Sequence, residues 1–112
     1  MKFDTDLINS LNRFKRIELS YEPDVPGFDE SIRHKILGHD LFVTKTGVLL
    51  LIHLENPGNG EEYTYSFPDI IQVELANYSN SHEKWYLYSL DRSKFKEHIR
   101  NEEMIYRLIF SK

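Results

Sequence analysis

The chain has 112 residues, of which 40% are hydrophobic and 13% aromatic, and its formal net charge is −4 at pH 7. This composition is typical of a globular protein and predicts a single domain over residues 1–112, long enough to bury a core without disulfides. The absence of cysteine excludes disulfides, thiolate catalysis and Cys-based zinc sites, and no apolar run approaches the roughly 20 residues of a membrane helix. We therefore expect a cytoplasmic protein with no leader and no membrane contact.

The first third of the chain predicts a helix and then a strand. Asp4 is a suitable N-cap for an amphipathic helix over residues 5–14. Its apolar residues recur at helical spacing: Leu7, Ile8, Leu11 and Phe14. From Arg16 the period changes to two, which predicts a half-buried strand. Residues 22–38 carry two prolines and no clear period, so their second half fits either a helical turn closed by Gly38 or a poorly patterned strand.

The most apolar run of the chain lies over residues 47–54. Five consecutive large aliphatic residues, 48–52, leave no polar face at either period, so we expect a central strand covered on both sides. Residues 41–43 precede it as a second strand, and the intervening Lys45-Thr46-Gly47 predicts a tight hairpin turn. A polar loop, residues 56–60, follows.

The rest of the chain predicts further strands and then helices. Residues 63–67 and 71–76 alternate as two strands separated by Pro68, and residues 85–90 form the last strand. Asp91 caps a helix over residues 92–100. A second short helix follows from the spacing of Met104, Ile105, Leu108 and Ile109. The expected fold class is α+β, a curved antiparallel sheet of about five or six strands with an N-terminal helix and C-terminal helices packed on it.

The charges are distributed unevenly along the chain. Between Thr46 and Glu83 there is no Lys or Arg, although the segment holds many acids: Glu55, Glu61, Glu62, Asp69, Glu74 and Glu83. This field argues against direct nucleic-acid binding and favours a positively charged protein partner, while an ordinary solvated acidic surface is an equal alternative.

The histidines are the main candidates for chemistry. His53 and Glu55 share one face of a strand, as in an acid/base pair or half a metal site, although the pattern favours a structural or rim histidine. His34, Lys35 and His39 supply the residue types of a ribonuclease-like site. No phosphate loop, nucleophile elbow or paired-histidine helix is present. We expect no enzyme, no cofactor and no metal site.

Aromatic residues are concentrated in the acidic half of the chain. In residues 85–88 aromatic side chains alternate onto both faces of a strand, so some must lie outside the core. Tyr and Trp beside carboxylates make good protein-binding surface, whereas core filling is the ordinary alternative for each one. The predicted partner-binding residues are Glu55, Glu61, Glu62 and Asp69 for electrostatic steering, with Tyr63, Tyr65, Trp85 and Tyr88 as anchors.

The pattern of residues 40–54, 85–95 and 105–109 resembles small bacterial sheet proteins of the immunity type, which neutralise a cognate toxin. The resemblance implies a monomeric or homodimeric inhibitor that occludes the active site of a basic partner, such as a bacterial nuclease toxin. Two alternatives stay open: a phage-encoded inhibitor of a nucleic-acid-binding defence complex, and a small hydrolase or nuclease that uses one of the histidines.

Overall fold

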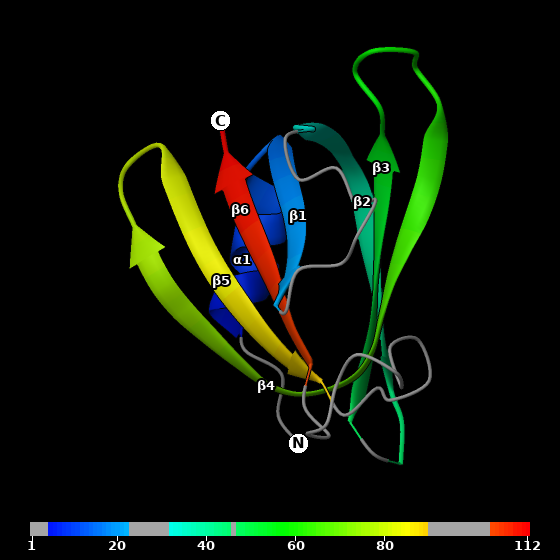
Figure 1. Cartoon of the computed structure of the whole chain (residues 1–112), viewed down its shortest axis with the longest axis vertical. Helices are drawn as coiled ribbons and strands as arrows, with labels where there is room; N and C mark the ends of the chain where they lie inside the picture. The colour runs from blue at the N-terminus through cyan, green and yellow to red at the C-terminus, as the bar shows by residue number, and fades with distance from the viewer. Residues whose placement is uncertain (1–4, 23–31, 46, 90–103) are drawn as a thin grey trace.

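A computed structural model of the chain describes residues 5–22, 32–45, 47–89 and 104–112 (Figure 1). The described residues form one helix followed by six strands, and none of their helices has the length and apolar character needed to traverse a bilayer. The elements are α1 (Thr5–Arg13), β1 (Arg16–Glu22), β2 (His34–Val43), β3 (Val48–Glu55), β4 (Glu62–Tyr78), β5 (His82–Ser89) and β6 (Met104–Ser111).

The six described strands form an antiparallel sheet in which each strand pairs with the next one along the chain. The sheet curves until β6 pairs along β1, and a short seam between β1 and β2 closes it into a barrel. The seam consists of the pairs Arg16 with Lys35 and Ile17 with His34. The predicted antiparallel sheet of about five or six strands is therefore confirmed.

Strand β4 runs through the position where the sequence predicted a break. Pro68 does not end it; the strand bends, with Asp69 at a positive φ of 53°. At the bend Ile70 pairs with Val48 of β3 on one side and with Ser89 of β5 on the other. The carbonyl of Pro68 accepts a hydrogen bond of 2.5 Å from the Ser89 hydroxyl. The expected strands 63–67 and 71–76 are thus two halves of one bent strand.

Strand β3 alternates between two environments. Its inward residues, Val48, Leu50, Ile52 and Leu54, are at most 2% exposed, whereas its outward residues, Leu49, Leu51, His53 and Glu55, are half-buried. The expectation that this strand is covered on both sides is wrong. A sheet that curves onto itself has one interior, and the outward leucines, Leu49 and Leu51, are only partly buried.

Helix α1 joins the same core. Figure 1 shows it behind β1, β5 and β6, and Leu7, Leu11 and Phe14 at its end are buried with the inward residues of the strands. The rings of Phe14 and Phe110 stack with their centroids 5.7 Å apart. The predicted helix is confirmed to within one residue, although its expected cap, Asp4, lies outside the described residues.

The C-terminal segment is a strand, and the helix expected near Met104 is wrong. Tyr106, Leu108 and Phe110 alternate inward and are fully buried, while β6 pairs with both β5 and β1. Residues 92–100, where the other C-terminal helix was expected, lie outside the described residues. Within the described part of the chain, the helical contribution to the fold is α1 alone.

The structure also defines residues 34–38, which the sequence left open, and the turn that follows β2. Residues 34–38 belong to β2, and the predicted turn between β2 and β3 is closed by a bond of 2.8 Å from the amide of Thr44 to the carbonyl of Gly47. A Cβ atom at Gly47 would lie 2.5 Å from the carbonyl oxygen of Ile70. The turn therefore requires glycine because the bend of β4 passes so close.

The alternation of β3 yields a direct test. Leu50→Ala removes a fully buried side chain and should lower the free energy of unfolding by about 2–5 kcal/mol. Leu51→Ala removes an outward, half-buried side chain and should cost about 1 kcal/mol. Urea denaturation measures both, and equal losses would contradict burial on one side only.

The contact at Gly47 yields a second test. Gly47→Ala forces the β2–β3 turn away from the backbone of Ile70 and should cost about 1–3 kcal/mol. Gly38→Ala is the matched control, because its Cβ would meet the nearest atom, in the His53 ring, at an ordinary 3.8 Å. Thermal melts followed by circular dichroism should rank Gly38→Ala as near neutral; a neutral Gly47→Ala would exclude the close approach.

Candidate functional site

Three of the four predicted steering acids meet at the β3–β4 hairpin. Glu55 lies directly opposite Glu62, and Glu61 immediately precedes Glu62. Like charges opposite each other destabilise a sheet, and here Lys35 offsets one of them, with its Nζ 3.9 Å from a Glu55 carboxylate oxygen. Neither Glu61 nor Glu62 makes an ion pair among the described residues. The fourth acid, Asp69, is at the bend of β4, roughly 23 Å along the strand from Glu62.

The predicted aromatic anchors are not brought together. Tyr63 and Tyr65 are half-buried on the inward face, opposite Leu54 and Ile52, and burial raises the pKa of both phenols. Trp85 is 1% exposed and belongs to the core, so it is not available as a surface anchor. Tyr88 is half-buried on the outward side of β5, opposite Gln72. The prediction that aromatics would occupy both faces of β5 holds, but they do not form one surface.

Three strands are joined by a chain of polar side chains on the outward side of the barrel. The Nε2 of His53 lies 2.7 Å from an Asp40 carboxylate oxygen, and its Nδ1 lies 2.8 Å from the Thr64 hydroxyl. The residue types match a nucleophile, a base and an orienting acid. However, the His53 and Asp40 side chains are 37% and 56% exposed on an open strand surface, where water is not excluded. The three side chains connect β2, β3 and β4 across the outward surface.

The other candidate histidines do not join this chain. His34 is 6% exposed, and one of its ring nitrogens lies within hydrogen-bonding distance of the Tyr63 hydroxyl. His39 is opposite the buried Ile52, on the other side of the sheet from His53. Among the described residues, no group of three or more His, Cys, Asp or Glu side chains could hold a metal ion. His34, His39 and His53 thus do not converge on one centre.

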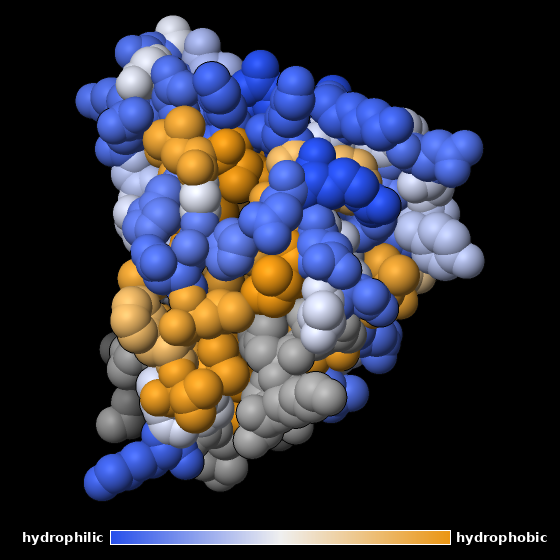
Figure 2. Space-filling view, turned by 180° about the vertical axis from the view of Figure 1, so that it is seen from behind, coloured by the Kyte–Doolittle hydropathy of each residue, from blue (hydrophilic) through white to orange (hydrophobic). Residues whose placement is uncertain are grey.

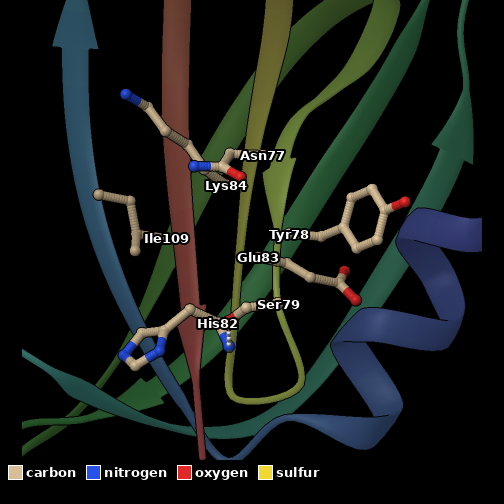
Figure 3. Close-up of a pocket in the computed structure, with 7 residues that line it drawn as sticks. All are labelled: Asn77, Tyr78, Ser79, His82, Glu83, Lys84 and Ile109. Carbon is tan, nitrogen blue, oxygen red and sulfur yellow. Dashed lines mark hydrogen bonds between the residues drawn. The ribbon is translucent and has the colours of Figure 1, made fainter.

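A pocket of about 220 Å³ lies at the β4–β5 hairpin. Figure 3 shows that Tyr78 and Glu83 point toward α1, whereas His82, Lys84 and Ile109 lie on the other side of the hairpin. The side chains that line the pocket therefore do not converge on a common point, as the polar groups of a ligand site do.

Glu83 is the polar residue on which the packing of α1 depends, and no sequence pattern singled it out. Its carboxylate accepts hydrogen bonds from Ser10 and Arg13 of α1, and one of 3.0 Å from Nε1 of Trp85. Burial alone would raise the pKa of Glu83, but the bonds from Ser10 and Trp85 and the charge of Arg13 outweigh it and hold the pKa below its usual range. A charged Glu83 thus fixes the helix to β5.

No family model, curated protein or solved structure matches this chain. Its function has to be argued from its own residues.

The bonds to Glu83 predict a pH-dependent stability. Because the pKa of Glu83 is lower in the folded state, its contribution is present above the unfolded-state pKa and is lost as the pH falls through the folded-state pKa. Glu83→Gln should cost about 2 kcal/mol at pH 7, and its difference from wild type should shrink in acid. Urea denaturation over a pH series measures this, with the exposed Glu74→Gln as control; a pH-independent difference would contradict the role of the charge.

Proposed function

We propose that the protein is a protein-binding inhibitor of the immunity type, which occludes the active site of a basic partner such as a bacterial nuclease toxin. The observation that supports it best is the acidic β3–β4 hairpin, where Glu61 and Glu62 have no ion-pair partner among the described residues. The sequence has no Lys or Arg from residue 46 to 83, so no cation within the hairpin weakens this field.

A nuclease active site carries cations because it binds phosphates, and an acidic hairpin offers these cations an alternative set of oxygens. Complementary charges act beyond contact distance and raise the association rate, while the lifetime of a complex depends on short-range contacts. Among the described residues, Tyr63 and Tyr65 follow the hairpin on β4, and both are half-buried. Trp85 has no part in this proposal, because it is enclosed in the core.

Charge reversal tests the proposal. The double variant Glu61→Lys/Glu62→Lys should slow association with a basic nuclease toxin from the same genome by about one order of magnitude or more. The effect should shrink at high salt. Surface plasmon resonance measures the association rate, and a nuclease assay measures inhibition.

Glu74→Lys is the matched control, because Glu74 is also exposed but lies opposite Tyr86, in the other half of β4. The proposal requires this variant to bind and inhibit like the wild type. Full inhibition by the hairpin double variant, with an unchanged association rate, would refute the role of the hairpin.

A further inference from the structure

The outward side of β2 and β3 carries exposed apolar side chains. Phe42 is 52% exposed and pairs with Leu49, and Leu51, two residues further along β3, is also half-buried on this side. Figure 2 shows apolar side chains gathered on the side of the molecule where β2 and β3 lie. We call the outward surface of β2, β3 and the first half of β4 the β2–β4 outer face. In a monomer this face leaves apolar area in contact with water.

The charges of this face are mostly compensated within the chain. Lys35 pairs with Glu55, and Asp40 pairs with His53 if the ring is protonated and hydrogen-bonds to it otherwise. Two exposed charges have no ion pair among the described residues: Glu62 at the hairpin end of the face, and Lys45 in the turn at the opposite end. The apolar side chains of the face thus lie toward the β2–β3 turn, near Lys45, and the polar side chains of Asp40, His53 and Thr64 separate them from the acidic hairpin end.

We infer that the β2–β4 outer face is the contact surface between two copies of this chain. When two such faces stack with their β3 strands antiparallel, Lys45 of each copy lies near Glu62 of the other. The contact is isologous, so it contains two symmetry-related Lys45–Glu62 pairs. In this arrangement the β2–β3 turn of one copy lies over the end of β3 and β4 of the other at which Glu62 is found. Phe42, Leu49 and Leu51 of both copies then lose contact with water.

This contact goes beyond the proposed function and does not require it. Because Glu62 takes part in both, the dimer and a complex with a basic partner exclude each other. Self-association is measured on the purified protein alone, so its failure leaves the proposed inhibition untouched, and a failure to inhibit leaves the dimer untouched.

Sedimentation velocity of the purified full-length chain over a wide concentration range tests the inference. We expect a monomer–dimer equilibrium that weakens with salt. Lys45→Glu or Glu62→Lys alone should raise the dissociation constant about tenfold, because each reversal creates two like-charge pairs in a two-fold dimer. The double variant Lys45→Glu/Glu62→Lys exchanges the charges and should restore the wild-type value.

Phe42→Ser should also raise the dissociation constant by about tenfold or more, because it removes an apolar side chain from the contact. Tyr78→Ser is the matched control, since Tyr78 is 72% exposed at the β4–β5 hairpin, and it should leave the constant unchanged. Thermal melts confirm that each variant is folded. A monomer at every concentration, larger assemblies in place of a dimer, or a double variant that does not recover would each overturn the inference.

Discussion

The bend in β4 is the constraint on which the rest of the structure depends. One strand pairs with β3 through its first half and with β5 through its second half, and Ile70 is the residue shared by both. Without this bend the sheet would be interrupted at β4, and among the described strands its two halves would be joined by the short β1–β2 seam alone. The bend needs a positive φ at Asp69 and a turn without a side chain at Gly47, because the two backbones approach so closely there. Closure then gives the six described strands a single core.

The carboxylates divide into those that hold the fold and those that are left for other contacts. Glu83 is largely enclosed and is satisfied by donors from α1 and from Trp85, so it is used within the chain. Glu61 and Glu62 stand at an exposed hairpin and have no ion pair among the described residues. The second group is not held by ion pairs within the described residues, so its charge is available to the partner that we propose. This division supports placing recognition at the β3–β4 hairpin, away from α1.

Periodicity was sufficient where it was unambiguous and failed where two periods overlapped. Leu7, Leu11 and Phe14 fit only a helix, and the hairpin around Gly47 fits only antiparallel strands, so both were predictable. Met104, Ile105, Leu108 and Ile109 fit a helix, but Tyr106, Leu108 and Phe110 fit a strand equally well, and pairing with β1 and β5 decides between them. Alternation also placed aromatic residues on both faces of β5 without showing which face is inward. Trp85 was therefore assigned to the surface. The role of Glu83 could not be predicted from local pattern, because its partners in α1 are distant in sequence.

The central claim is that β4 is one strand shared by two halves of a single cooperative sheet. Native-state hydrogen exchange of the backbone amides, measured by NMR with low denaturant, tests it most directly. The hydrogen-bonded amides in residues 62–67 and those in residues 72–78 should exchange with the same free energy of opening, equal to that of the protected amides of β3 and β5. Two separate values, with one half of β4 and its neighbours opening well below global unfolding, would contradict the account.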